Sequence, residues 1–343
     1  MGSTPIFVLS PPRSGSTLLQ RVLGSHSQIF THPEPHIIAP IAHLGFHHTV
    51  ERAPYDHLNA AQAFREFVDE LPHGEEDYLD ALRAYATTLY SRVLPDPGLH
   101  FLDKTPENVR FWPFLLKLFP DARYLALTRH PAAIMHSVAT SFFNGDYEAA
   151  RTSNRVLERF VPAMASLLRG NDPRVHTIRY EDLVEHASET LKTAMEHLNL
   201  TFEPGQVTYG EHEHITKSYG DPFGVHQHDR PVTTSKERWV ATVSSDSDAR
   251  KALEKSLGAL SDEDLEAYGY PRDTLFEPLH RNPDRVQAAV IPKGNLGYKV
   301  QRQVFMALKA SAKQPIIYKG LNQLRYMCDV VLRARDQEDQ GTD

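Results

Sequence analysis

Short apolar runs alternate with longer amphipathic stretches through the first half of the chain. Four of these runs are rich in β-branched and aromatic residues, as buried strands are, and they cover residues 6–10, 100–104, 124–128 and 175–180. A stretch with helical spacing follows each run, beginning near Ser16, Pro106, Pro131 and Glu181. Strands and helices that alternate in this order predict an α/β fold with a parallel sheet flanked by helices.

The segment between the first two predicted strands is long and mostly helical in its pattern. Apolar residues recur at helical spacing in residues 60–70 and 77–92. We therefore expect a helical insertion after the first strand–helix unit. Residues 203–236 are rich in Gly, Pro, His and Asp, which predicts long loops.

The C-terminal part of the chain has a different character. Prolines punctuate the residues after 271, and two basic amphipathic stretches near 298–312 and 320–335 predict a C-terminal helical extension. The expected parts of the chain are an α/β domain at 1–271, a basic helical extension at 272–335 and an acidic, disordered tail at 336–343.

Composition and charge exclude several classes of protein. The contents of 41% hydrophobic and 24% charged residues are typical of a globular domain. The single cysteine, Cys328, excludes an internal disulfide and a Cys-ligated zinc site, and fits a reducing compartment. No apolar run approaches the ~18 residues of a membrane-spanning helix, so we expect a cytoplasmic protein. A formal net charge of −7 argues against general nucleic-acid binding.

Positive charge is nevertheless concentrated in one segment, residues 281–335, which contains eleven Lys or Arg residues and two acidic residues. One interpretation is that its apolar faces pack on the core or on a second copy of the chain, with the lysines in solvent. The other is a docking surface for an acidic partner, such as an acyl-carrier protein, or for an anionic membrane surface.

The clearest chemical motif follows the first predicted strand. The sequence Pro-Pro-Arg-Ser-Gly-Ser-Thr, residues 11–17, leads directly into a helical pattern. A strand, a tight turn and a helix N-terminus direct several backbone N–H groups at one point, and such a point binds phosphate-like anions. An ordinary capped strand-to-helix turn is the alternative. It is not a Walker A loop, because Ser16 stands where that loop needs a lysine, which disfavours ATP chemistry.

Four segments together resemble the sulfotransferases that use 3'-phosphoadenosine-5'-phosphosulfate (PAPS). Residues 12–19 resemble the family's 5'-phosphosulfate loop, and residues 124–131, with Ser137, resemble its 3'-phosphate motif. The Arg-Tyr-Glu-Asp-Leu sequence at 179–183 matches a further family segment, and residues 236–239 resemble the loop that closes over the nucleotide. The four occur in the family order. The nearest resemblance is to sulfotransferase domains of bacterial polyketide assembly lines and to tyrosylprotein sulfotransferases.

This resemblance implies a P-loop-type α/β domain that binds PAPS without a metal. PAPS carries phosphate groups at two places on its ribose, so two separate cationic clusters are expected. Arg13 and its loop would serve one cluster, and Arg129 with Ser137 the other. The residues assigned to PAPS are Arg13, Ser14, Gly15, Ser16, Thr17, Leu18, Arg129, Ser137, Tyr180, Ser235 and Lys236.

The resemblance also supplies catalytic candidates for an in-line displacement. Glu34 lies where tyrosylprotein sulfotransferases carry their general base, and the prolines on both sides of it restrict the backbone. His36 is the alternative base. Lys104 ends the second predicted strand, where family members place a lysine against the bridging oxygen of PAPS. A surface acid and a surface lysine are the alternatives for Glu34 and Lys104.

The histidine pairs at 212/214 and 226/228 lack a third grouped ligand, so we expect exposed loops rather than a metal site, with His226 or His228 near the acceptor. The acceptor is expected to bear a hydroxyl group. An acyl chain on a carrier protein, a phenol, a sugar and a lipid all remain open. A kinase with a degenerate P-loop and a non-catalytic PAPS-binding module are the alternative functions.

Overall fold

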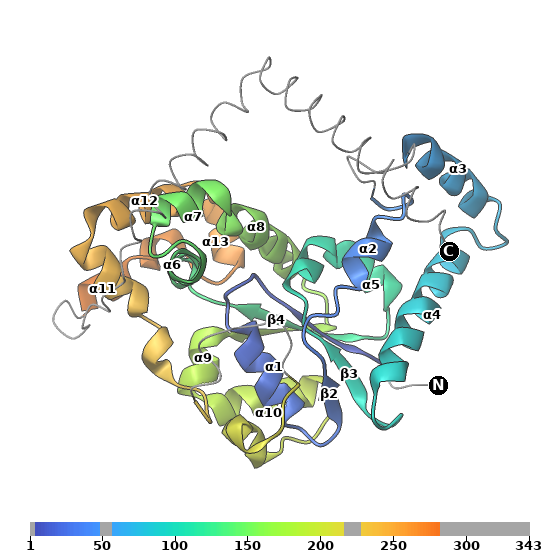
Figure 1. Cartoon of the computed structure of the whole chain (residues 1–343), viewed down its shortest axis with the longest axis horizontal. Helices are drawn as coiled ribbons and strands as arrows, with labels where there is room; N and C mark the ends of the chain where they lie inside the picture. The colour runs from blue at the N-terminus through green and yellow to red at the C-terminus, as the bar shows by residue number, and fades with distance from the viewer. Residues whose placement is uncertain (1–3, 49–56, 216–227, 282–343) are drawn as a thin grey trace, which may run out of the picture. The chain divides into compact units, whose positions relative to one another are not determined.

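Five parallel strands form the sheet at the centre of the computed structural model, which describes residues 4–48, 57–215 and 228–281 (Figure 1). The strand order is β2-β3-β1-β4-β5. The strand bounds are β1 Ile6–Leu9, β2 Ile29–Thr31, β3 His100–Asp103, β4 Arg123–Thr128 and β5 Val175–Arg179. The predicted parallel sheet is confirmed, and each of the four predicted strands ends within one residue of its expected bounds.

Strand β2 was missing from the sequence prediction. It has three residues, which is too few to show the alternating pattern of a strand. It forms at the sheet edge by pairing with β3, where Ile29 lies opposite His100 and Thr31 opposite Leu102. The predicted helical insertion is confirmed, and it begins after β2. Its helices are α2 Ile38–Ala42, α3 His57–Asp69 and α4 Glu75–Val93.

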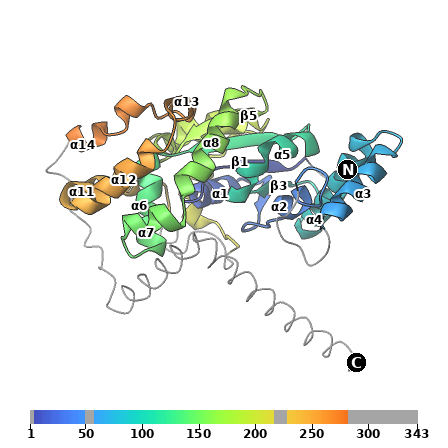
Figure 2. The ribbon, with the colours of Figure 1, turned by 90° about the horizontal axis from the view of Figure 1, so that it is seen from above.

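Helices cover both faces of the sheet (Figures 1 and 2). On one face lie α1 Ser16–Gly24, α9 Tyr180–Glu185, α10 Ala187–His197 and the 3₁₀ helix η2 Pro204–Glu211. On the other face, with α2 and α4, lie η1 Pro106–Phe111, α5 Trp112–Leu118, α6 Pro131–Phe142, α7 Tyr147–Ser153, α8 Val156–Arg169, α11 Arg238–Ser245, α12 Ser247–Gly258 and α13 Asp262–Ala267. The helix predicted near Pro106 thus begins as a 3₁₀ turn and continues as α5.

The continuous apolar run of β1 follows from this two-sided cover. Ile6 and Val8 face the α1 side, whereas Phe7 and Leu9 face the α4 side. All four are buried, because in a parallel sheet both faces are packed. On the α4 side, the Phe7 ring stacks on Tyr124 of β4 with centroids 5.5 Å apart.

The described chain continues past residue 271 with short helices, in the proline-punctuated stretch that precedes the expected basic helices. These are η5 Arg272–Thr274 and α14 Glu277–Arg281; a further short helix, η4 Thr233–Ser235, precedes α11. Leu275, between η5 and α14, is 1% exposed and belongs to the main core. The basic helices expected at 298–312 and 320–335, the acidic tail and His226 lie outside the described residues. Within the described part of the chain, no helix is long and apolar enough to cross a membrane.

Candidate active site

The loop between β1 and α1, the candidate anion site, leads from the end of a buried strand directly into a helix N-terminus. Gly15 is the N-cap of α1 and has a φ of 93°, and as a glycine it has no side chain with which to cap the first turn of the helix. A Cβ atom on Gly15 would lie 2.4 Å from Cδ2 of the Tyr180 ring. The hydroxyl of Ser14 is buried and donates a hydrogen bond to the Pro11 carbonyl at 2.7 Å, so it holds the shape of the loop. The first amides of α1 thus receive no cap from the side chain of the N-cap residue, which is the arrangement expected of a candidate anion site.

Arg129, which follows β4, joins three segments that are far apart in the sequence. Its side chain donates hydrogen bonds to the carbonyl oxygens of Arg13, at 3.0 Å, and Ser235, at 2.7 Å. Its guanidinium carbon lies 4.1 Å from the centroid of the Tyr180 ring. Four of the residues assigned to PAPS are therefore neighbours in the structure: Arg13, Arg129, Tyr180 and Ser235.

The two phosphate clusters expected from the sequence are not separate. Arg13 donates from Nε to the Ser137 hydroxyl at 3.1 Å and from a terminal nitrogen to the Ser141 hydroxyl at 3.0 Å. The reason is the strand order: β1 and β4 are adjacent, so the loop after β1 and the helix after β4 begin side by side. Ser141 was not predicted. It lies one helical turn beyond Ser137 on α6, and that spacing was a usable signal.

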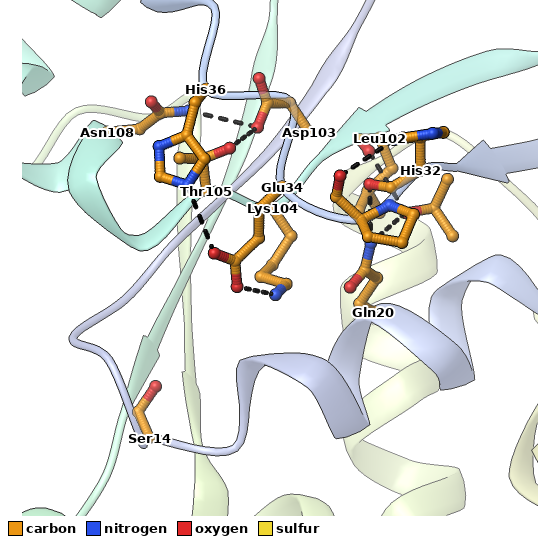
Figure 3. Close-up of polar contacts among 12 residues, drawn as sticks. Ser14, Gln20, His32, Glu34, His36, Leu102, Asp103, Lys104, Thr105 and Asn108 are labelled. Carbon is orange, nitrogen blue, oxygen red and sulfur yellow. Dashed lines mark hydrogen bonds and ion pairs between the residues drawn. The ribbon is translucent and has the colours of Figure 1, made fainter. Parts of the chain in front are cut away.

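Glu34 and Lys104 form a short ion pair at the same edge of the sheet (Figure 3). Lys104 Nζ donates to Glu34 Oε1 at 2.6 Å. Both residues follow paired strands, since Thr31 of β2 lies opposite Leu102 of β3. His36 completes the group, with Nε2 3.5 Å from Glu34 Oε2. The structure thus brings together all three catalytic candidates.

The environments of these three side chains differ. Lys104 is 0% exposed, the Glu34 side chain is 16% exposed and the His36 side chain 40%. His36 has a φ of 52°, in the left-handed region that residues with a Cβ atom seldom adopt. Figure 3 shows Glu34 and Lys104 extending toward the side of the phosphate loop that carries Ser14. This arrangement places a carboxylate and a buried ammonium group beside a candidate anion site.

A buried carboxylate beside Lys104 was not among the predicted site residues. Asp103 accepts hydrogen bonds from the hydroxyls of Tyr90, at 2.6 Å, and Thr105, at 2.8 Å, and from the amide of Asn108 at 3.3 Å. Burial raises the pKa of Asp103, and these hydrogen bonds act in the opposite direction. Successive side chains on a strand point to opposite faces, so Asp103 anchors one face while Lys104 serves the other. The feature of the sequence that could have identified Asp103 is an acidic residue at the end of a buried apolar strand.

Two part-buried histidines, His130 and His136, lie next to the residues of the predicted 3'-phosphate motif. Burial lowers the pKa values of His130 and His136 to about 4, and the nearby charge of Arg129 acts in the same direction. His130 stacks on Trp239 with ring centroids 5.0 Å apart, and its side chain accepts a hydrogen bond from the amide of Ala132. Both imidazoles are therefore neutral at pH 7.

The remaining predicted residues are more dispersed. Leu18 is buried in the core on the α1 side, while Ser16 and Thr17 lie in the first turn of α1. Lys236 pairs with Glu185 at 2.5 Å on the surface. His214 Nε2 lies 2.7 Å from the carbonyl of Tyr209. Among residues 4–48, 57–215 and 228–281, no group of three or more His, Cys, Asp or Glu side chains could hold a metal ion.

Comparison with known proteins places these features in context. Residues 5–204 match the sequence model described as the sulfotransferase family. The nodulation protein NoeE of Sinorhizobium fredii is 27% identical over 244 residues, which cover 63% of this chain and 55% of NoeE. A protein-tyrosine sulfotransferase of Drosophila melanogaster is 22% identical over 252 residues, which cover 70% of this chain and 48% of that protein. The chain thus spans about half the length of these two curated relatives.

Two sulfotransferase domains are among the solved structures that match the chain. The sulfotransferase domain of the Synechococcus PCC 7002 olefin synthase has a TM-score of 0.49 and 20% identity, covering 76% of this chain and 96% of that domain. The sulfotransferase domain of the curacin biosynthetic pathway has a TM-score of 0.46 and 22% identity, covering 74% and 97%.

Proposed function

The chain belongs to the sulfotransferase family, whose model matches residues 5–204, and from this we propose that it transfers a sulfonate group from PAPS to a hydroxyl group of its acceptor. The observation that carries the proposal is the convergence of two groups at one edge of the sheet. One is the loop before α1 with Arg13, Arg129 and Ser137, and the other is the Glu34–Lys104 pair.

The first group suits the phosphates of PAPS. The uncapped first turn of α1 offers backbone N–H groups, to which an anion is attracted also by the helix dipole. Arg13 and Arg129 supply full positive charges, and Ser137 supplies a hydroxyl. Because the chain carries a formal net charge of −7, such a local cluster, rather than the overall field, would attract the anionic donor.

The second group suits the chemical step. The acceptor oxygen attacks sulfur, the bond between sulfur and the 5'-phosphate oxygen breaks, and 3'-phosphoadenosine-5'-phosphate (PAP) leaves. Glu34 would take the hydroxyl proton, and Lys104 would stabilise the negative charge that develops on the leaving phosphate. His36, beside Glu34, is the second candidate for the base.

Binding of PAP tests the proposed donor. A ligand that binds only the folded state raises the melting temperature by mass action, so PAP should raise it and ATP at equal concentration far less. Arg129→Ala should reduce the PAP effect. Equal stabilisation by ATP and PAP would contradict the proposal and favour the kinase alternative.

Turnover tests the proposed base. Loss of a general base typically costs ~10²–10⁴ in rate, so Glu34→Gln should lower kcat by that factor in an assay of sulfonate release from PAPS. The acceptor panel should include phenols, among them tyrosine peptides, sugars, lipids and hydroxyacyl chains on a carrier protein. If Glu34→Gln keeps its activity and His36→Ala loses it, the base is His36. Tight PAP binding with no sulfonated product across the panel would favour a non-catalytic module.

A further inference from the structure

The buried ammonium group of Lys104 has one partner in the part of the chain that the structure describes, and that partner is Glu34. An ammonium group carries three N–H donors, and burial without a full set of acceptors is costly. Lys104 is nevertheless 0% exposed. Its charge is therefore balanced by a single carboxylate, with capacity left for a further anionic partner.

This pairing conflicts with the two roles proposed for the site. Lys104 Nζ donates to Glu34 Oε1 at 2.6 Å, so this carboxylate oxygen is already occupied and is not free to accept the proton of an acceptor hydroxyl. A lysine that is held by a carboxylate is likewise less available to a leaving phosphate. The structure carries no ligand, and in it the two groups neutralise each other.

We propose that binding of PAPS breaks this pair, so that Lys104 exchanges Glu34 for the 5'-phosphate oxygen of PAPS and Glu34 becomes a competent base only then. The inference rests on the proposed function. The exchange needs no change of fold: β1 and β3 are adjacent, so Lys104 after β3 and the phosphate loop after β1 lie at the same edge of the sheet. Lysine suits such an exchange, because its charge is a single point on a flexible stem.

The exchange predicts an effect on the affinity for PAP that electrostatic repulsion between Glu34 and the anionic ligand does not predict. In the wild-type chain, part of the binding energy of PAP is spent on separating Lys104 from Glu34. Glu34→Gln removes that cost, so PAP should bind about 5-fold to 20-fold more tightly. The gain should exist only while Lys104 is present. If Glu34 merely repels the anionic ligand, the same substitution should tighten binding equally without Lys104.

A double-mutant cycle on the Kd of PAP separates these cases. Titration calorimetry would compare the wild type, Glu34→Gln, Lys104→Met and the double variant, where methionine keeps the length and apolar stem of the lysine. We expect Glu34→Gln to tighten binding in the Lys104 chain and to change it by less than about 2-fold in the Lys104→Met chain. Lys104→Gln is a second neutral variant if Lys104→Met does not fold. Asp80→Asn is the matched control, because it removes a carboxylate from the exposed pair with Arg83 on α4 and should leave the Kd unchanged.

Three results would overturn the inference, and they differ from one another. Equal tightening in both backgrounds would indicate repulsion alone. Weaker binding by Glu34→Gln would indicate that Glu34 holds Lys104 in place for PAP. If none of the four folded proteins binds PAP, the proposed function fails and the inference fails with it.

Discussion

At the scale of single residues, the most consequential side chains are two part-buried histidines next to the predicted phosphate-binding residues. His130 follows Arg129 directly and His136 precedes Ser137, and both remain neutral because burial disfavours the imidazolium ion. Their neutrality leaves the positive charge of this region to Arg13 and Arg129.

The lowered pKa values of these two histidines predict that the protein is sensitive to acid. The folded-state pKa of each is about 4, whereas the ordinary value is 6.5. Their contribution to stability is therefore complete above pH 6.5, and it is lost progressively as the pH falls toward 4, because the unfolded chain binds the protons first. A full shift of this size contributes about 3 kcal/mol to the free energy of unfolding for each histidine, and about 2 kcal/mol of this contribution is lost by pH 5.

The variant His130→Asn isolates one of these groups, since asparagine retains a side-chain acceptor for the N-cap of α6 but does not titrate. Urea unfolding at pH 7.5 and pH 5 should show a smaller loss of unfolding free energy in His130→Asn than in the wild type, by about 2 kcal/mol. Identical losses in the two proteins would show that His130 is not the group that titrates.

At the scale of elements, the junction of β1 and α1 depends on one glycine. Gly15 has a φ of 93°, and an added Cβ atom would enter the Tyr180 ring, which itself lies against the guanidinium group of Arg129. A substitution that adds a Cβ atom at Gly15 would thus strain the loop and displace the Tyr180 ring from its place beside Arg129.

We expect Gly15→Ala to destabilise the protein by at least ~1 kcal/mol and to weaken PAP binding by more than ~10-fold, since the loop must shift to accommodate the methyl group. Gly258→Ala is the matched control, because nothing lies within 4 Å of its added Cβ atom and its φ is not in the left-handed region. Thermal unfolding and calorimetry with PAP measure the two effects. Near-wild-type PAP affinity in Gly15→Ala would show that the loop tolerates the change.

The end of β3 depends on the hydrogen-bonded carboxylate of Asp103. Tyr90→Phe removes the 2.6 Å hydrogen bond from the tyrosine hydroxyl while it keeps the ring that stacks on Phe101. In this variant Asp103 Oδ2 stays buried but loses the hydrogen bond from the tyrosine, which should lower the free energy of unfolding by about 1–3 kcal/mol. Tyr85→Phe on the same helix is the control, because Tyr85 is exposed and should cost less than ~0.5 kcal/mol. Equal stabilities of the two variants in urea would refute this account of Asp103.

At the scale of the whole molecule, the described α/β unit extends past the expected domain boundary. Leu275 is buried in the main core, and Phe276 and Leu279 pack against it. A truncation that tests the basic segment must therefore fall after α14, which ends at residue 281.

A chain cut after residue 281 removes ten of the eleven basic residues of the 281–335 segment. If that segment docks an acidic carrier protein, the truncated chain should bind PAP normally but lose any salt-sensitive preference for a carrier-bound over a free acceptor. Activity assays at low and physiological ionic strength would measure this preference. Failure of the truncated chain to fold, or no preference in the full chain, would instead assign the segment a structural role.

The local pattern of residues was enough to predict the strands with a continuous apolar run and the loop with glycine and hydroxyl residues. The apolar runs of β1, β3, β4 and β5 are distinct because both faces of the sheet are buried. The glycine and hydroxyl residues after β1 mark a loop because each has a local conformational reason to be there. The family resemblance added Arg129, Ser137, Glu34 and Lys104 as candidates and grouped Arg129 with Ser137, but it paired neither Glu34 with Lys104 nor Arg13 with Ser137.

The order of the strands in the sheet decides which of these candidate residues are in contact. Glu34 and Lys104 are 70 residues apart, and they pair because β2, a strand too short to recognise, forms beside β3. Arg13 reaches Ser137, 124 residues away, because β1 lies beside β4. The strand order depends on how the helices pack across the whole sheet, so it cannot be predicted from any local stretch of sequence. The sequence alone therefore determined the types of groups at this edge, and the tertiary structure determined their partners.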